Sequence, residues 1–529
     1  MRSRFEPGGA VAVGLLSLVF FIVGAVLLWA KWRNQADGLL DFAKMARNYE
    51  MLLQGFPYQY RALYYGYFYA GFLVLILPLY ALCRSVTTIF AVHLLAFTAA
   101  VPLLYLLARR RLPGVALPLA IAAMYVLSPT VDLLTIGVLR FEAMWSLVYL
   151  LTVYCLWTGR WRAALWLTTL GCFLRLDGMP AFFILGLLWR RENRVIGRSM
   201  IRRSIFVAVL MIAAMVVFRL VSGIAPELGQ SHLGDDGLSG LLKSLGSAAG
   251  YRHGLLLLQL LLLPLLAPRW LWPAAASALY ILASAGTFYK LPLVHTLLVT
   301  DSWYTPALHT HDTILLPVLF VAAIEGLRNG LAWLERRRGA RRWDAPALAG
   351  ILAVLALAGH WFGTPTNLGP VPLTPAFNLD YYRQTPHSRA AWQALALAPR
   401  DRPGLMQFNF AERAWDYPLI EEIYPNTVVW DKYEYALIDL YAYSVNMEKD
   451  ELLMKVDELL ARGDFQVERF ADGIVFFRRG QPDAKNEELR AFLAADRERL
   501  RQNLPSPYRD GPRERQRALD LTFSAAMLP

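Results

Sequence analysis

The chain has 529 residues, a length that in a soluble protein predicts three or four domains. Its composition argues otherwise, because 56% of the residues are apolar, 18% are charged and the mean hydropathy is +0.36. A soluble enzyme, a disordered chain and a fibrous repeat are excluded. The net charge of +12 comes from arginines clustered between long apolar segments. That pattern is typical of a membrane protein with basic cytoplasmic loops, and it gives no support to a nucleic-acid partner.

Apolar segments long enough to cross a bilayer recur along the first two thirds of the chain. A crossing needs about 17–25 mostly apolar residues, or fewer where neighbouring helices shelter the ends. About eleven spans are predicted, near residues 10–30, 86–108, 113–131, 142–158, 162–175, 178–190, 205–223, 254–268, 270–287, 312–328 and 345–363. The first lacks a small-residue cleavage site, so we interpret it as a retained helix and not as a signal peptide.

The basic loops predict the orientation. Five of them are expected in the cytoplasm: Arg109-Arg110-Arg111, Arg160 with Arg162, Arg190 to Arg203, Arg269, and Arg328 to Arg342. They share a side only if the apolar segment 67–82, which contains Pro78, does not cross. We predict that it lies in the outer face of the bilayer, with a short real span as the alternative. The N-terminus is then cytoplasmic and the C-terminus is outside.

The C-terminal region has the composition of a soluble α/β domain. The elements predicted in it are strands at 404–410, 427–430 and 435–440, a helix at 449–461, a hairpin at 465–478 that turns at Asp472-Gly473, and a charged helix at 486–503. The predicted fold class is mainly α. A polytopic helical bundle (residues 1–363) precedes a small extracytoplasmic α/β domain (364–480), and a charged helix and tail (481–529) follow it.

The first outer loop, within residues 31–85, contains acidic residues directly after the first span. On a helix, Asp37, Asp41, Lys44 and Asn48 fall at i, i+4, i+7 and i+11, which places them on one face. One interpretation is the solvated face of an interfacial helix. The other is a general base, placed where a lipid headgroup meets a substrate from the water side.

Two arginine–carboxylate pairs are predicted at the same outer side, Arg140 with Glu142 and Arg175 with Asp177. Charges at membrane depth are costly, so they face a cavity or pair with one another. Each pair is either a structural ion pair at a helix end or a site whose guanidinium group binds phosphate oxygens.

A last outer cluster joins Asp301 to Tyr304 with His309-Thr310-His311-Asp312. Two histidines at i, i+2 without a clear third ligand are a weak signal for a divalent metal, which stays an alternative. We favour hydrogen-bonding or phosphate-contacting roles for His309 and His311, supported by Tyr304 and Asp312. His93, alone in an apolar span, is predicted to be a packed core residue.

Several chemistries are not indicated by any motif. Cys83, Cys155 and Cys172 lie in or at the edge of apolar segments without a pairing spacing, which argues against disulfides and against a Cys-ligated metal. The sequence contains no Gly-rich phosphate loop followed by Lys-Ser/Thr, no dinucleotide fingerprint and no serine elbow. ATP-driven transport and a cytoplasmic nucleotide-sugar donor therefore have no support.

These features together resemble a known superfamily. An acidic outer loop after the first span, an interfacial apolar helix, and a span ending Leu-Ala-Arg-Arg-Arg look like the polytopic GT-C glycosyltransferases. Within it, the chain is most similar to an uncharacterised family of predicted bacterial membrane proteins. The similar stretches are Pro78 to Leu82, Leu104 to Arg109, Arg140 to Ala143, Leu174 to Asp177, Leu315 to Pro317, Ala323 to Leu327 and Asp472 to Val475.

The resemblance implies an activity. Such enzymes take a sugar from a polyprenyl-phosphate lipid on the periplasmic or luminal side and transfer it to a glycan, lipid or protein acceptor. The catalytic acid of the superfamily maps onto Asp37 or Asp41. Where relatives have His-Pro-Glu and Lys-Glu-Asp elements, this chain has Arg140-Phe141-Glu142 and Arg175-Leu176-Asp177, so the roles of Glu142 and Asp177 are open.

Two other classes of function remain open. A transporter or lipid flippase of the cell-envelope glycan pathway predicts polar residues through the midplane and related sequence halves, whereas the clusters here lie at one face. A scaffold protein predicts that the carboxylates are dispensable and the C-terminal domain is not.

Overall fold

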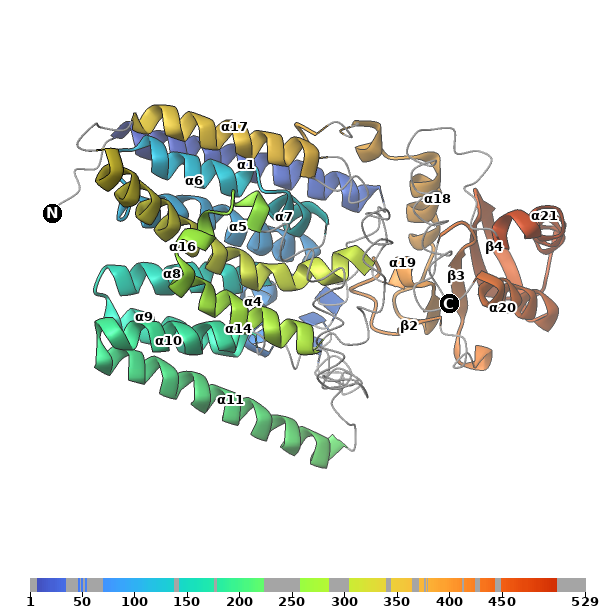
Figure 1. Cartoon of the computed structure of the whole chain (residues 1–529). Coiled ribbons are helices and arrows are strands. Elements are labelled where there is room, and N and C mark those ends of the chain that lie inside the picture. Colours follow the sequence, from blue (N-terminus) through green and yellow to red (C-terminus); the bar gives the residue numbers. More distant parts are fainter. Residues whose placement is uncertain are drawn as a thin grey trace.

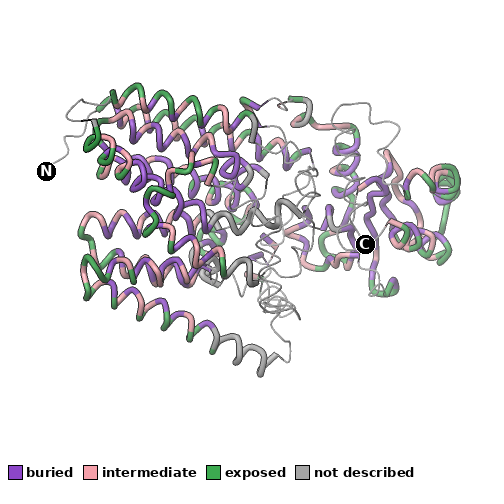
Figure 2. The backbone as a smooth tube through the Cα atoms, in the orientation of Figure 1, coloured by how far each residue is buried: buried purple, intermediate pink, exposed green. Residues whose placement is uncertain are grey.

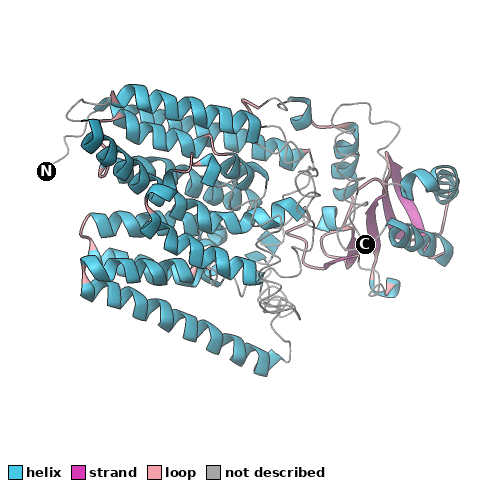
Figure 3. Cartoon of the chain, in the orientation of Figure 1, coloured by secondary structure: helices cyan, strands magenta, loops and turns pink. Residues whose placement is uncertain are grey.

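A computed structural model of the chain describes residues 7–34, 46–47, 49–50, 53–54, 70–137, 142–175, 178–222, 257–284, 304–338, 344–363, 371–374, 377, 379–411, 413–423, 429–442 and 449–501. It has two parts, a bundle of helices and a smaller domain with a sheet at one end of the bundle (Figure 1). The mainly helical fold class is confirmed, with the strands confined to the C-terminal domain (Figure 3).

Most helices of the bundle coincide with predicted apolar segments. They are α1 (Pro7–Arg33), α4 (Ala70–Leu82), α5 (Val86–Arg109), α6 (Ala116–Val126), α7 (Pro129–Asp132), α8 (Glu142–Trp157), α9 (Trp161–Leu174), α10 (Met179–Glu192), α11 (Arg194–Ser222), α14 (Pro268–Ser284), α16 (Tyr304–Arg338) and α17 (Ala345–Gly363). Their inward faces form one continuous apolar core. Apolar side chains that stay exposed on the outer helices are those that a lipid environment would cover (Figure 2).

Within the described residues, three helical segments are long and apolar enough to cross a membrane, namely Pro7–Arg33, Val86–Arg109 and Ile314–Arg337. A fourth candidate is the bent pair Ala116–Val126 and Pro129–Ile136. The count of eleven spans therefore stays a prediction. Helix α4 has 13 residues, about 20 Å of helix, which is shorter than the roughly 30 Å hydrocarbon layer.

Two predicted spans differ from the structure. The segment 113–131 is not one helix, because α6 ends at Val126 and the chain bends by 47° before continuing as α7 and a π-helical turn, η3 (Leu133–Gly137). Residue 129 is a proline, which cannot extend the preceding helix. The predicted span 254–268 is also not one continuous helix over its described part, because residues 257–259 are helical and a turn and the short 3-10 helix η4 (Leu263–Leu266) follow them.

These two breaks are next to each other in space. Gln259, which ends the helical residues 257–259 just before the turn to η4, accepts hydrogen bonds from Ser128 (3.2 Å) and Thr130 (2.9 Å) at the bend between α6 and α7. Backbone groups freed inside a bundle need polar partners, and irregular backbone is stable there only where protein covers it. Apolar content alone could not reveal this, because both segments are mostly hydrophobic.

The C-terminal domain has a five-stranded sheet in the order β2-β1-β3-β5-β4. The strands are β1 (Gly404–Met406), β2 (Ile420–Glu422), β3 (Tyr435–Asp439), β4 (Phe465–Ala471) and β5 (Ile474–Arg479). Strands β2, β1 and β3 are parallel, while β5 runs antiparallel to both β3 and β4. Asp472 and Gly473 have φ angles of 49° and 76°, as the predicted two-residue hairpin turn requires.

Helices cover both faces of this sheet. One face packs against α18 (Pro386–Leu395) and α19 (Phe408–Ala411), and the other against α20 (Lys449–Arg462) and α21 (Ala484–Arg501). Residues of β3 alternate between the two cores, as the two-residue period of a strand requires. The predicted strand at 435–440, the helix at 449–461, the hairpin and the charged helix are confirmed within a few residues.

Two strand predictions in this domain were wrong. Strand β1 ends at Met406, and α19 occupies part of the range that was expected to continue it to 410. Of the second range only residues 429 and 430 are described, and there Trp430 begins a 3-10 turn, η7 (Trp430–Lys432). The second strand of the sheet in chain order is β2 instead. β2 has three residues, too few for an alternating pattern to be recognised.

Candidate functional site

Helix ends divide the bundle into two chemically different ends. The connections α5–α6, α8–α9, α10–α11 and α16–α17 lie at the end opposite the C-terminal domain (Figure 1). There Arg111 contacts Glu325 at 2.9 Å and Arg328 contacts the same carboxylate at 2.7 Å. Arg269 lies 3.8 Å from Glu192. The basic loops predicted to share a side therefore do share one end of the bundle, and we call it the basic end.

The opposite end, which we call the capped end, contacts the C-terminal domain. Trp392 of α18 donates to the backbone oxygen of Arg33, the last residue of α1, at 2.8 Å. Arg47 donates to the backbone oxygen of Ile420 in the edge strand β2. The guanidinium carbon of Arg413 lies 5.8 Å from the Trp32 ring. The domain is thus held against the end of α1 and against the segment that follows it in the chain.

Few of the predicted site residues fall in the described part of the chain. Asp37, Asp41, Arg140 and Asp177 lie outside the described residues. Glu142 begins α8, and Tyr304, His309, His311 and Asp312 lie near the start of α16, but their side chains are not among those described. The loop expected to run to Asp312 was wrong from Tyr304 onward. A proline at position 306 is compatible with the first turn of a helix, where its missing N–H is not needed.

Arg175 is the one predicted phosphate ligand whose surroundings are described. It caps the C-terminal end of α9 in an extended conformation, and its backbone N–H lies 3.4 Å from the oxygen of Gly171. This places it in the connection from α9 to α10, as predicted, and at the capped end of the bundle. The residue is 7% exposed, so its guanidinium group is inside the protein and not on an open surface.

The capped end also buries polar residues that the sequence analysis did not select. Lys31 of α1 is 1% exposed and donates to the backbone oxygen of Ile136 at 2.8 Å. His93 of α5, also buried, hydrogen-bonds the oxygen of Leu134 at 3.1 Å. Both acceptor oxygens belong to η3. There the change from α to π geometry alters which backbone N–H groups and oxygens hydrogen-bond to one another. His93 is a packed core residue, as predicted.

A carboxylate and an imidazole meet beside this cluster. Asp132 of α7 lies 2.9 Å from Nδ1 of His360 in α17, and both side chains are buried. The other ring nitrogen of His360 is 2.9 Å from the oxygen of Pro372. The signal that sequence reasoning overlooked was a single acid inside an apolar segment, which is a functional candidate by default in a membrane protein.

A second carboxylate lies where the first outer loop meets α4. Glu50 accepts from Tyr80 at 3.2 Å and lies 3.5 Å from Arg84. Burial and the charge of Glu50 raise the pKa of the Tyr80 hydroxyl. On the domain side, Asp416 pairs with Arg400 at 2.6 Å, and burial raises the pKa of its carboxyl above the usual range although Arg400 opposes the shift. The junction therefore contains acidic groups from both parts of the chain.

The C-terminal domain has its own buried polar cluster at the carboxyl ends of β1 and β3. His387 lies 2.8 Å from the carboxylate of Asp439 through Nε2 and 2.8 Å from the backbone oxygen of Asp472 through Nδ1. Asp439 also accepts from the backbone N–H groups of Tyr441 (2.9 Å) and Ala442 (3.0 Å). Because acceptors flank both ring nitrogens, the arrangement suits the protonated imidazole.

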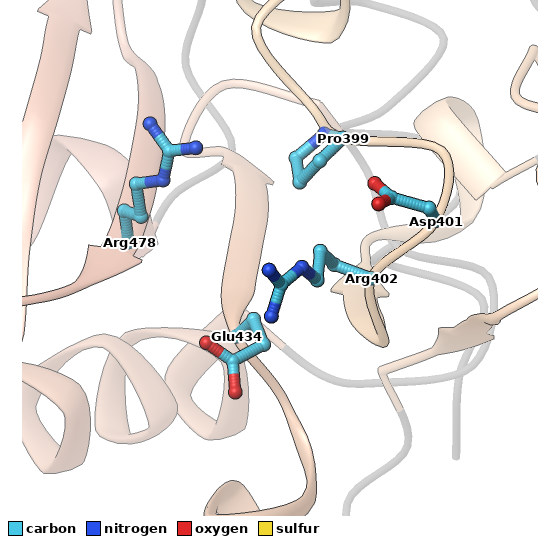
Figure 4. Close-up of a pocket in the computed structure, with 5 residues that line it drawn as sticks. All are labelled: Pro399, Asp401, Arg402, Glu434 and Arg478. Atoms are coloured by element: carbon cyan, nitrogen blue, oxygen red, sulfur yellow. The ribbon is translucent and has the colours of Figure 1, made fainter.

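A surface hollow of about 380 Å³ lies at the opposite end of these strands, beside the starts of β1 and β3 and the end of β5 (Figure 4). Its lining residues are Pro399, Asp401, Arg402, Glu434 and Arg478, so positive and negative side chains alternate around it. Arg478 also contacts Glu468 on the neighbouring strand at 3.2 Å. Among the described residues, no group of three or more His, Cys, Asp or Glu side chains has a geometry that would hold a metal ion.

The fold and the division of charge between its ends define a helical membrane protein with a small α/β domain. A family model for predicted membrane proteins, DUF2079, matches residues 45–403, more than half of the chain. The chain belongs to this family, and the expected likeness to an uncharacterised family of predicted membrane proteins is confirmed. A search of curated proteins finds no match.

Proposed function

We propose that the chain is a membrane glycosyltransferase of the GT-C type. It would move a sugar from a polyprenyl-phosphate-linked donor to a glycan, lipid or protein acceptor at the capped end of the bundle. One observation carries the proposal. The elements next to the predicted acids and arginines, the end of α1, the start of α8, the end of α9 and the start of α16, all lie at the end that holds the C-terminal domain (Figure 1).

The proposed reaction is a sugar transfer with inversion. Asp37 or Asp41 takes the proton of an acceptor hydroxyl as its oxygen attacks the anomeric carbon and the bond to the lipid phosphate breaks. Arg140 and Arg175, with His309 and His311, stabilise the negative charge that grows on the departing phosphate. The buried position of Arg175 favours this role, because a charge–charge interaction is stronger away from water.

The same proposal assigns an orientation. The basic end lies in the cytoplasm of a bacterium, so the capped end and the C-terminal domain lie on the periplasmic side of the inner membrane. The domain contacts the first outer loop through Arg47 and the end of α1 through Trp392. A domain in this place would shield the reaction from water and contribute to acceptor binding.

The test compares Asp37→Asn and Asp41→Asn in proteoliposomes that contain a radiolabelled polyprenyl-phosphate sugar. A general base contributes about 10²–10⁴-fold, so one of the two variants should lose that much turnover while remaining folded. Glu335→Gln, an exposed acid at the basic end of α16, is the matched control and should keep full activity.

Full activity in both aspartate variants would remove the proposal. Movement of lipid or solute across the vesicle, without a glycosidic product, would assign the chain to the transporters instead.

A further inference from the structure

One face of α11 concentrates positive charge near the basic end. Arg194, Arg198 and Arg202 follow one another at i, i+4 and i+8, so their side chains share a face of the helix. Successive members are about 6 Å apart along the helix axis. All three are exposed, and Arg190 at the end of α10 adds a fourth exposed guanidinium group beside them. We call Arg194, Arg198 and Arg202 the arginine strip.

Among the described residues, the strip groups three arginines without an ion-pair partner on one helix face, unlike Arg111, Arg269 and Arg328 at the same end. Within the part of the chain that is described, Arg111, Arg269 and Arg328 each contact a carboxylate, but none of the strip residues does. Arg203, one residue further, instead donates to Thr169 at 2.9 Å and stacks over Trp166. The neighbouring charge of Arg194, above all, lowers the pKa of the Arg198 guanidinium group. The strip is therefore positive charge that no residue in the described part of the chain neutralises.

The same face continues as an exposed apolar surface. Ile205, Phe206 and Val209 follow the strip by three, four and seven residues and are 50%, 64% and 60% exposed. Helix α11 lies at the margin of the bundle, and none of the other described helices covers this face (Figures 1 and 2). From Arg198 to Val209 the axis advances by about 16 Å, close to the roughly 15 Å depth of one hydrocarbon leaflet.

We propose that this face of α11 binds an anionic phospholipid of the leaflet at the basic end. The lipid phosphate contacts the arginine strip, and an acyl chain lies along Ile205, Phe206 and Val209. Guanidinium groups match phosphate oxygens through paired N–H donors. Because the strip has no carboxylate partner among the described residues, it does not have to break an ion pair before it binds a phosphate. The order of charged and apolar surface along the helix fits an amphiphile better than it fits a nucleic acid or an acidic protein, which would leave the apolar part uncovered.

The test uses the purified full chain in a neutral detergent, with dioleoylphosphatidylglycerol as probe and dioleoylphosphatidylcholine as reference. Each arginine near a membrane surface contributes about fivefold in affinity for anionic lipid, so Arg194→Gln/Arg198→Gln/Arg202→Gln should weaken phosphatidylglycerol binding by about a hundredfold. Phosphatidylcholine binding should not change. The matched control, Arg160→Gln/Arg162→Gln/Arg336→Gln, removes the same charge from other exposed positions at the basic end and should bind like the parent chain.

Three results would overturn the proposal. The first is equal phosphatidylglycerol affinity in the strip variant and the control. The second is full competition by inorganic phosphate or by a dihexanoyl lipid, which would mean that no acyl chain is bound. The third is tighter binding of an RNA oligonucleotide or an acidic peptide to the same arginines. If the triple variant does not fold, the single variants should each lose about fivefold.

Discussion

Replacement of Asp439 by alanine should destabilise the C-terminal domain more than any surface change in it. The carboxylate accepts from four groups, so alanine leaves four donors without this partner: His387, Asn409, Tyr441 and Ala442. An unpaired buried donor costs about 1–3 kcal/mol, and breaking a buried ion pair by removing one member costs about 3–5 kcal/mol once relaxation is included. We therefore expect a loss of about 3–5 kcal/mol in the free energy of unfolding of the domain.

Pulse proteolysis in increasing urea, with the full chain in detergent, measures this loss through the fraction of uncleaved C-terminal domain. Asp439→Asn retains an oxygen for the two backbone donors but loses the charge beside His387, so it should fall between the parent and the alanine variant. Asp431→Ala is the control, because this carboxylate is 75% exposed and its pair with Arg462 contributes less than about 1 kcal/mol. If Asp439→Ala shifts the midpoint no more than this control, the cluster does not hold the domain together.

Two further changes test packing and charge. Gly326→Ala places a Cβ 1.9 Å from the backbone oxygen of Leu263, so α16 and η4 must separate at a cost of about 1–3 kcal/mol, seen as a lower thermal unfolding temperature. Gly350→Ala meets no atom within 4 Å and should keep or raise that temperature. Hydrogen bonding to Arg462 lowers the pKa of Asp464, so its charge stabilises the fold above the ordinary aspartate pKa of about 3.9. Asp464→Asn should then cost about 0.5 kcal/mol at pH 7, and the difference should disappear as the pH falls through the lowered pKa.

The sequence predicted the elements whose signal is local. Apolar runs located most helices, and Asp472-Gly473 located the hairpin, because a two-residue turn with positive φ angles favours these residues. The bend after Val126 and the strand at Ile420 were missed for the opposite reason. Each depends on a distant partner, Gln259 for the bend and β1 for the strand, and neither partner leaves a pattern in the segment itself.

The dependence on distant partners also explains why the predicted site residues differ from the polar residues that the structure brings together. Asp37 and Asp41 were selected because they are neighbours in sequence on one expected helix face. Asp132 and His360 are far apart in the chain and meet only because α7 packs near the end of α17. Pairs of this kind can be found only when the fold is known, so a sequence-based list of polar residues in a membrane protein is biased toward local clusters.

The two ends of the bundle neutralise their charges in different ways, and this difference bears on where chemistry can occur. At the basic end Glu325 is buried between Arg111 and Arg328. Its carboxylate is neutralised by the two guanidinium groups and is not accessible to a ligand. At the capped end the ammonium group of Lys31 donates to a backbone oxygen. In that contact the charge faces the dipole of a peptide group and not a carboxylate. A cation held by dipoles keeps more of its field than one held by a carboxylate, because a carboxylate cancels the charge. Of the arginines at the basic end, the exposed strip on α11 is therefore better suited to attract an anionic lipid phosphate than Arg111 and Arg328, which share the carboxylate of Glu325.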